Sequence, residues 1–224
     1  MGRGRGGGDD VFFGQEDIQK LGARLAQAAA PTHAELLRRR EEDGHRSIIH
    51  GDFKTANVFF RKKGEEASAN IPHPAVERGA SSSSAAAAAA SSAAMIDFQW
   101  SGVGVPEMDV AYLLLSSAAL PVLNDLETFL RGYYEEFVAN AAGNEDAESD
   151  ASPPLPSYDQ FLKDFKLAVV DYARVVVGYQ WQGAKAEWMS TRKDELGACT
   201  HNRSLPHVKW FIRYVTNVLS ELGA

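Results

Sequence analysis

The sequence contains one cysteine, Cys199, among its 224 residues. A single thiol cannot form a disulfide within the chain, and it cannot supply a cysteine-based zinc site. A chain without internal disulfides fits a reducing compartment, so we expect a cytoplasmic protein. We interpret Cys199 itself as an incidental thiol.

Excess positive charge and long apolar runs are also lacking. Lysine and arginine number 23 against 30 acidic residues, which gives a formal net charge of −7. This balance disfavours a nucleic-acid-binding surface, because such a surface needs clustered excess Lys and Arg. No apolar run approaches the ~20 residues that span a bilayer, and no apolar segment follows the first arginines as it does in a secretory signal. We therefore expect neither nucleic acid nor membrane as a partner.

Two segments have compositions that do not predict a packed structure. Residues 1–14 are rich in Gly and Arg and are expected to be disordered. Residues 63–94 contain runs of Ser and Ala with too little apolar bulk to offset the entropy of ordering. We interpret them as a low-complexity, solvated insertion within a folded unit that spans residues 15–224.

The apolar spacing of the remaining chain predicts a mostly helical α+β protein. A helical pattern covers residues 15–42, in which Pro31 should end one helix or start the next. Short apolar runs predict strands at residues 47–49, 58–60 and 95–98. Further helices are predicted at residues 108–119, 123–139, 158–189 and 206–222. The third of these could be divided by a break near Gly178 or Gly183.

The stretch IIHGDFKTANVFF places polar residues between two apolar runs. In kinases an Asp orients the attacking hydroxyl and accepts its proton, and an Asn five residues later holds magnesium. Asp52 and Asn57 match this spacing, and His50 precedes Asp52 by two residues. A second Asp, which follows a strand, must also bind magnesium, and Asp97 in MIDFQW comes directly after two apolar residues. Both Asn57 and Asp97 offer the hard oxygen ligands that Mg²⁺ prefers.

Each of these residues alone has an ordinary structural explanation. An Asp on a loop is more often a turn former or a helix cap than a catalyst. The ordered combination is more specific, because each member is flanked by the apolar runs that would hold it rigid. The set as a whole therefore favours a phosphoryl-transfer site.

HGDFKTANVFF followed by MIDFQWSGVGVPEMDVAYLL resembles the aminoglycoside phosphotransferase and choline-kinase-like superfamily. The resemblance is greatest to the ecdysteroid-kinase-like (CHK kinase-like) family, over roughly residues 45–120. It implies the C-terminal lobe of a protein-kinase-like fold, mostly helical, with a small β-hairpin catalytic core. The HGD and DFQ motifs differ from the HRD and DFG of protein kinases themselves.

The resemblance also implies roles for individual residues. Asp52 would be the catalytic base, and Asn57 and Asp97 would be magnesium ligands that help to hold ATP. His50 would be a structural member of the loop. Asp109 would support the loop from the start of the next helix, although an acid that complements the helix dipole would occupy the same position.

Lys54 lies two residues after Asp52, where protein kinases carry a lysine that faces the phosphate. A phosphate-facing role and a solvent-facing side chain are equally compatible with this position.

A complete kinase also needs an N-terminal lobe with a phosphate-covering loop and a strand lysine. The residues before IIHGD have a helical pattern, so we expect the chain to represent the C-terminal lobe with the N-terminal lobe missing. The GRGRGG at residues 2–7 matches G-x-G-x-x-G, but no strand precedes it to present the backbone to a phosphate. We interpret this match as an accident of composition.

The sequence thus predicts an ATP- and Mg²⁺-dependent phosphotransferase that acts on a hydroxyl of a small molecule, such as an amino alcohol or a sterol-like or sugar-like compound. The alternative is a non-catalytic kinase-like binding module. Aromatic residues of the C-terminal half could line the substrate pocket, although aromatic residues at helical spacing are more often core. These residues are Tyr172, Tyr179, Trp181 and Trp188.

Overall fold

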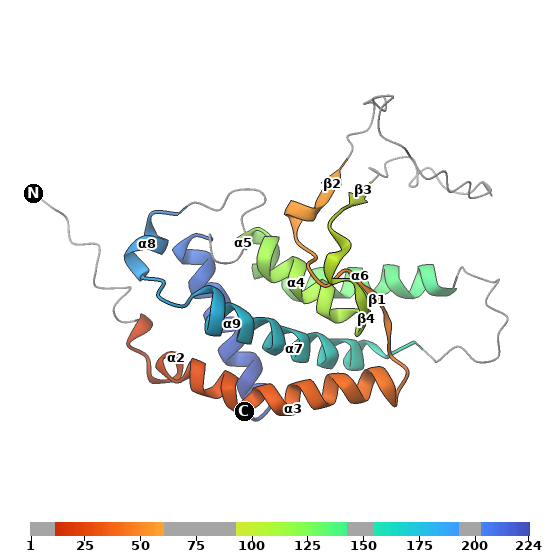
Figure 1. Ribbon diagram of the computed structural model, residues 1–224, viewed down its shortest axis with the longest axis horizontal. Coiled ribbons are helices and arrows are strands. Elements are labelled where there is room, and N and C mark those ends of the chain that lie inside the picture. Colours follow the sequence, from red (N-terminus) through yellow and green to blue (C-terminus); the bar gives the residue numbers. More distant parts are fainter. Residues whose placement is uncertain (1–11, 61–92, 143–154, 193–202) are drawn as a thin grey trace, which may run out of the picture.

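The computed structural model describes residues 12–60, 93–142, 155–192 and 203–224 (Figure 1). Cys199 lies outside the described residues, as do residues 1–11 and 63–92 of the two segments for which no packed structure was predicted.

Helices make up most of the described chain. They are α2 (Glu16–Gln19), α3 (Leu21–Glu41), α4 (Glu107–Ser117), α5 (Leu120–Asn124), α6 (Leu126–Ala142), α7 (Tyr158–Val175), α8 (Ala186–Ser190) and α9 (Leu205–Glu221). Two short 3₁₀-helices, η1 (Thr55–Asn57) and η3 (Phe98–Trp100), and one π-helical segment, η4 (Val176–Gln180), complete the set. None of the helices within the described residues is both long enough and apolar enough to cross a bilayer.

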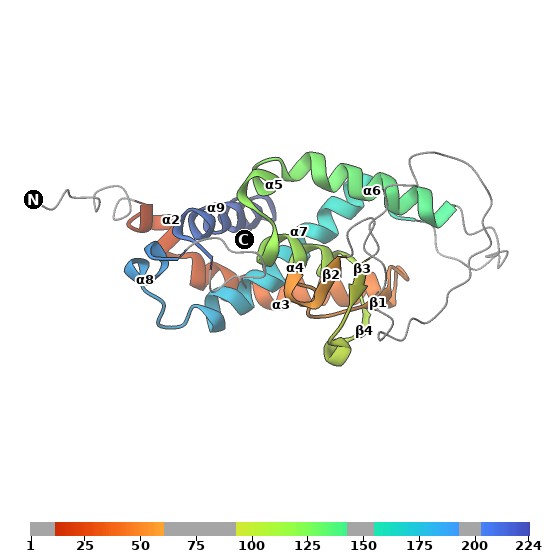
Figure 2. The ribbon, with the colours of Figure 1, turned by 90° about the horizontal axis from the view of Figure 1, so that it is seen from above.

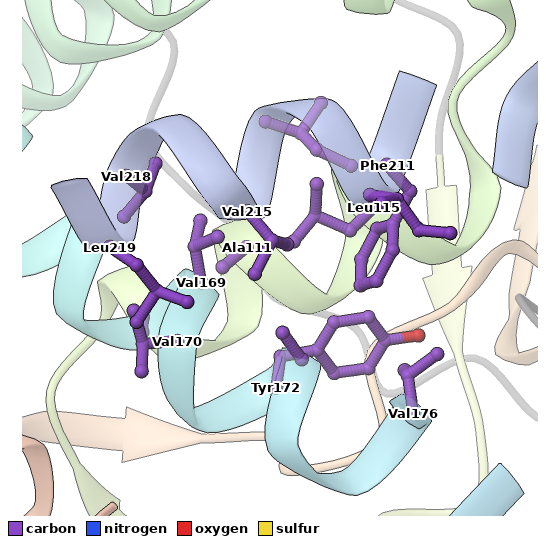
Figure 3. Close-up of a cluster of buried hydrophobic side chains, with 14 of the residues drawn as sticks. Ala111, Leu115, Val169, Val170, Tyr172, Val176, Phe211, Val215, Val218 and Leu219 are labelled. Atoms are coloured by element: carbon purple, nitrogen blue, oxygen red, sulfur yellow. The ribbon is translucent and has the colours of Figure 1, made fainter. Parts of the chain in front are cut away.

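Helix α7 is the centre of the helical body, because α3, α4, α6 and α9 all pack against it. Nine of its residues are buried, and all of them except Asp164 are apolar or aromatic, as expected for the core-facing side of an amphipathic helix. Figure 3 shows side chains of α7 and η4 meeting those of α9 and α4 in this core. The labelled residues are Ala111, Leu115, Val169, Val170, Tyr172, Val176, Phe211, Val215, Val218 and Leu219.

The prediction that Pro31 would end one helix or start another is wrong, because Pro31 lies inside the continuous helix α3. Proline removes one intrahelical hydrogen bond and disfavours a helix interior. Here Ala28 and Thr32 on either side of it are buried, and α3 packs along α7. Tertiary packing therefore outweighs the local preference of the proline.

The packed structure begins earlier in the chain than the sequence predicted. Phe12 falls within the segment predicted to be disordered, yet it is buried in the main core with 3% of its surface exposed. Lys209 and Arg213 of α9 lie over its ring. The core therefore includes a residue of the short apolar run Val11-Phe12-Phe13, which follows the Gly- and Asp-rich residues 6–10.

The four strands in the described part of the chain form two separate antiparallel pairs. Strand β1 (Ser47–Ile49) pairs with β4 (Gly102–Gly104), and β2 (Val58–Phe60) pairs with β3 (Ala93–Met95). Strands β2 and β3 run side by side in both views (Figures 1 and 2). Small antiparallel sheets on a mostly helical body agree with the predicted α+β class.

Two of the three predicted strands, β1 and β2, are confirmed, and the third is displaced. Strand β3 ends at Met95, so Ala93 and Ala94 are strand residues inside the segment predicted as an insertion. The strand cannot continue through residue 97, because Asp97 has a left-handed backbone with φ 65° and ψ 56°. Strand β4 was not predicted, since glycine at both of its ends is unfavourable for a strand.

The C-terminal helices agree with the sequence pattern apart from their ends. The helix predicted at residues 123–139 is divided between α5 and α6, which meet at Asp125. The long helix predicted from residue 158 gives way to η4 and then to a turn at Gly183, whose φ is +76°. A break near Gly183 is therefore confirmed.

Candidate functional site

The strand pairing brings the two predicted motifs together. The HGD loop (residues 50–57) joins β1 to β2, and the IDFQ segment (residues 96–99) follows β3. The backbone N–H of Ile96 donates to the carbonyl oxygen of Asn57 at 3.1 Å, which extends the contact between β2 and β3 by one residue. Asp97 therefore directly follows a residue that is bonded to Asn57.

His50 connects the HGD loop to the IDFQ segment from a buried position, with 5% of its surface exposed. Its Nε2 lies 2.8 Å from the carbonyl oxygen of Ile96, and its Nδ1 lies 3.3 Å from the backbone N–H of Asp52. The carbonyl can only accept and the N–H can only donate, so the tautomer with its proton on Nε2 satisfies both contacts. The ring also lies against Phe53 and Phe98, at centroid distances of 5.8 and 4.9 Å.

Asp109, on the first turn of α4, binds the backbone of the HGD loop. Its Oδ2 accepts from the N–H of His50 at 2.6 Å, and its Oδ1 accepts from the N–H of Gly51 at 2.9 Å. An acid that only complemented the helix dipole would not make these two bonds. Helix α4 thus holds the start of the loop in place through one side chain.

Gly51 provides a second point of contact between the two segments. Its φ is +78°, a conformation that glycine adopts readily. A β-carbon at this position would overlap the carbonyl oxygen of Trp100. The glycine of the HGD motif is therefore required by both the turn of the loop and the close approach of η3.

The carboxylate of Asp52 receives three side-chain donors. Lys54 Nζ lies 2.7 Å from Oδ2, the hydroxyl of Tyr112 donates to Oδ1 at 2.7 Å, and Asn57 Nδ2 donates to Oδ2 at 3.1 Å. Burial alone would raise the pKa of Asp52, but the hydrogen bonds from Lys54 and Tyr112 outweigh it and hold the pKa below its ordinary value of 3.8. Asp52 is therefore an anion at neutral pH.

Tyr112 was not among the predicted site residues. It lies one turn after Asp109 on α4, so the two side chains share a face of the helix. That spacing is the signal in the sequence that could have found it, once Asp109 had been placed against the loop.

Asn57 and Asp97 offer oxygen atoms that suit a hard cation. The Nδ2 of Asn57 also donates to the backbone carbonyl of Asp52 at 2.9 Å, so its two bonds orient the amide and leave Oδ1 for a ligand. Asp97 is exposed, and it is the one non-glycine residue with a positive φ in the described part of the chain. Such a backbone costs about 1–3 kcal/mol and is common at functional sites. Both groups therefore fit the chemistry of Mg²⁺.

Lys54 does not extend into solvent, because 23% of its side chain is exposed and its ammonium pairs with Asp52. The solvent-facing alternative for Lys54 is therefore not the conformation observed. The ammonium lies instead beside the carboxylate at the centre of the site.

A pocket of about 400 Å³ opens beside Asp52, between the HGD loop and helices α4 and α7. Its lining includes Asp52, Trp100, Tyr112, Asp171, Tyr172 and Val175. The rings of Tyr112 and Tyr172 meet edge to face with centroids 4.7 Å apart. Tyr172 therefore belongs both to the core, with 6% of its surface exposed, and to the wall of this pocket.

The other three aromatic residues considered for the substrate pocket lie elsewhere. Tyr179 is 76% exposed, and Trp188 lines a different pocket next to Lys185. Trp181 packs against Phe211 in the core, at a centroid distance of 5.4 Å. Helical spacing alone could not distinguish these positions from that of Tyr172.

A buried cluster of charged residues joins helices α3, α4 and α7. Arg39 of α3 donates to both oxygens of Asp164 of α7 at 2.9–3.0 Å. His45, which precedes β1, lies with Nε2 2.9 Å from Glu107 of α4. Burial alone would lower the pKa of His45, but the hydrogen bond to Glu107 and the nearby negative charges raise it above its ordinary value.

A family model described as the ecdysteroid kinase-like family matches residues 83–143 of the chain. The matched range contains Asp97, Asp109 and Tyr112, and it ends before α7. The resemblance inferred from the motifs is thus confirmed over this range, and it suggests a kinase-like fold. No curated protein and no solved structure matches the chain.

Proposed function

We propose that this chain carries the catalytic half of an ATP-dependent phosphotransferase that acts on a hydroxyl group of a small molecule in the cytoplasm. One observation carries the proposal: an ionised Asp52 lies at the wall of a 400 Å³ pocket, in a loop that is bonded to the segment holding Asp97. The ecdysteroid kinase-like match over residues 83–143 supports the same class of reaction.

Asp52 would position the acceptor hydroxyl. The hydroxyl donates a hydrogen bond to the carboxylate, its oxygen attacks the γ-phosphorus of ATP, its proton passes to Asp52, and ADP leaves. The pKa of Asp52 is depressed, so this carboxylate is a weak base. It would therefore accept the proton only late, as the new P–O bond forms, and orientation of the nucleophile would be its larger contribution.

The residues around Asp52 would divide the remaining tasks. Tyr112 and Asn57 fix the orientation of the carboxylate, and His50 and Asp109 fix the loop that carries it. Lys54 places a positive charge beside Asp52, where it could also face the transferred phosphate. Mg²⁺ held by Asn57 Oδ1 and Asp97 would supply the charge that offsets the phosphate oxygens.

A non-catalytic kinase-like binding module is the second candidate. In the described residues before β1 the chain forms helices α2 and α3, whereas a kinase covers the phosphates of ATP with a strand and loop. The two candidates differ in whether bound ATP is consumed.

The test combines a binding and a turnover measurement on the whole chain. Titration calorimetry should detect ATP binding that requires Mg²⁺ and is lost in Asp97→Ala. Transfer of the γ-phosphoryl group to a panel of small alcohols should then fall by about 10²–10⁴ in Asp52→Asn, with ATP binding retained.

The matched control is Asp159→Asn, which removes an exposed carboxylate from the first turn of α7. Transfer by this variant should equal that of the original chain. Unchanged transfer in Asp52→Asn would contradict the proposed mechanism. Magnesium-dependent ATP binding with no transfer to any alcohol would favour the binding module.

A further inference from the structure

The HGD loop ends in a single turn of 3₁₀-helix, η1, which carries the candidate magnesium ligand Asn57. A turn of three residues is weak by itself, because few hydrogen bonds offset the entropy of ordering it. Lys54, which precedes the turn, directs its side chain to Asp52 and does not cap the N–H groups of η1. The orientation of Asn57 therefore depends on contacts from other elements.

Ser117, the last residue of α4, makes one of these contacts. The backbone N–H of Thr55 donates to Oγ of Ser117 at 3.0 Å. The first N–H groups of a helix have no acceptor within the helix itself. Ser117 thus caps η1 from a position 62 residues further along the chain.

The hydroxyl of Ser117 is itself held in place. Its oxygen lies 2.8 Å from Oγ of Ser116, which is a buried residue. A hydroxyl has one proton and two lone pairs, so Ser117 can bond to Ser116 and accept from Thr55 at the same time. The second bond restricts rotation of the Ser117 side chain and keeps its oxygen directed at the loop.

Arg203 fixes the end of α4 on which Ser117 lies. Nη2 of this buried side chain donates to the carbonyl oxygen of Ala118 at 2.7 Å, and Nη1 donates to that of Ser116 at 3.4 Å. The last carbonyl groups of a helix lack partners within it, and a positive charge at this end is favourable. Ser117 lies between these two residues and is thereby tied to the chain that precedes α9.

Ser117 also completes a series of contacts from α4 that follows the order of the loop. Asp109 and Tyr112, earlier on the helix, contact residues 50–52. Ser117, at the end of the helix, contacts Thr55. Helix α4 therefore runs along the HGD loop and supports it near both ends.

We propose that Ser117 is a positioning residue that sets the affinity of the site for Mg²⁺, because it holds η1 so that Oδ1 of Asn57 faces the cation. This inference rests on the proposed function and names a further residue on which its magnesium site depends. The carbonyl oxygen of Asn57 accepts from Ile96 on the other side, so loss of the Ser117 bond would free the loop on one side only. The fraction of chains with Asn57 in place would fall, and the apparent affinity for Mg²⁺ would fall with it.

The test is titration calorimetry of the whole chain with ATP, once with excess Mg²⁺ and once with a chelator. The ratio of the two dissociation constants measures how much the magnesium site adds to ATP binding. Ser117→Ala should lower this ratio by about three- to tenfold, because it leaves the N–H of Thr55 without its acceptor. A general loss of packing would weaken binding under both conditions and leave the ratio unchanged.

Two further variants separate the hydroxyl from the rest of the side chain. Ser117→Thr keeps the hydroxyl and should restore the ratio. Ser190→Ala is the matched control, because Ser190 is also the last residue of a helix, α8, and its hydroxyl donates to the carbonyl oxygen of Glu187 in the same helix. This control should keep the original ratio. An unchanged ratio in Ser117→Ala, or an equal fall in Ser117→Thr or Ser190→Ala, would overturn the inference.

Hydrogen exchange of the original chain gives a second test that needs no variant. The amide of Thr55 should exchange on the order of tenfold more slowly than an unprotected amide, because its proton is bonded to Ser117. Exchange at the rate of an unprotected amide would mean that this bond does not form. That result would overturn the inference even if Ser117→Ala failed to fold.

These measurements are independent of phosphoryl transfer. A ratio that depends on Ser117, without transfer to any alcohol, would leave the positioning role standing while the proposed function failed. Transfer with a ratio that is unchanged in Ser117→Ala would do the reverse. ATP binding by the original chain that does not require Mg²⁺ would overturn both.

Discussion

The hydroxyl of Tyr112 is the donor on Asp52 that comes from the helical body rather than from the HGD loop. Tyr112→Phe removes it and keeps the ring, which still packs against Tyr172. We expect the pKa of Asp52 to rise toward its ordinary value and the carboxylate to lose orientation. Phosphoryl transfer should fall by about tenfold, and the acid side of the pH–rate profile should move to higher pH.

The control for Tyr112→Phe is Tyr134→Phe. This substitution also removes a hydrogen bond, in which the hydroxyl of Tyr134 donates to the carbonyl oxygen of Pro156. That bond joins α6 to the chain before α7 and lies away from Asp52. The control should leave both the rate and the pH profile unchanged. A rate and an acid limb equal to those of the original chain in Tyr112→Phe would show that the bond does not position Asp52.

The sequence could identify those site residues that lie close together along the chain, within one short motif. Asp52 and Asn57 are five positions apart on one loop, and the structure places them in contact. Tyr112 and Asp171 reach the same pocket from helices far along the chain. Their arrival depends on how α4 and α7 dock, which no short motif specifies. The left-handed backbone of Asp97 was missed for a related reason, because a residue after two apolar ones is expected to continue a strand.

At the scale of secondary structure, α4 supports the HGD loop through one carboxylate. Asp109→Asn should disrupt this support, because an amide can accept only one of the two backbone N–H groups and turns its own N–H toward the other. We expect a loss of about 1–3 kcal/mol in the free energy of unfolding. Urea titration measures it.

Glu127→Gln is the matched control, because Glu127 is also an acid in the first turn of a helix, α6. Loss of its favourable interaction with the helix dipole should reduce stability by less than about 1 kcal/mol. Equal effects of the two substitutions would mean that Asp109 acts only through the dipole of α4.

Helices were easier to predict than strands in this chain. Long apolar periodicities located both ends of α4 and α9 and the start of α7 to within a few residues, because packing against a common core imposes the helical spacing. Pro31 misled the prediction because local preference was given more weight than burial of the turn around it. Strand β4 has three residues, two of them glycine, so its pairing with β1 carries no pattern of its own.

At the scale of the whole molecule, the pair of His45 and Glu107 links the chain before β1 to α4 inside the buried cluster of charged residues. The pKa of His45 is raised in the folded state, so protonated His45 stabilises the fold. This contribution is complete below the ordinary value of 6.5 and is lost as the pH rises through the folded pKa.

His45→Gln should therefore be less stable than the original chain at about pH 6, and the difference should shrink toward about pH 9. Urea titrations at several pH values measure it. Glu107→Gln removes the charged acceptor of the same pair. The part of the unfolding free energy that depends on the protonation of His45 should therefore be lost in this variant as well. A difference between His45→Gln and the original chain that stays constant over this range would contradict the assignment.

The pairing of Phe60 with Ala93 has a consequence for how this molecule can vary. The chain leaves the site at the end of β2 and returns to it at the start of β3, next to the point of departure. Closing a longer connection costs only about 0.6 kcal/mol for each doubling of its length. This hairpin is therefore a natural grafting point, where a foreign domain or a reporter can be spliced in while Asn57 and Asp97 keep their register.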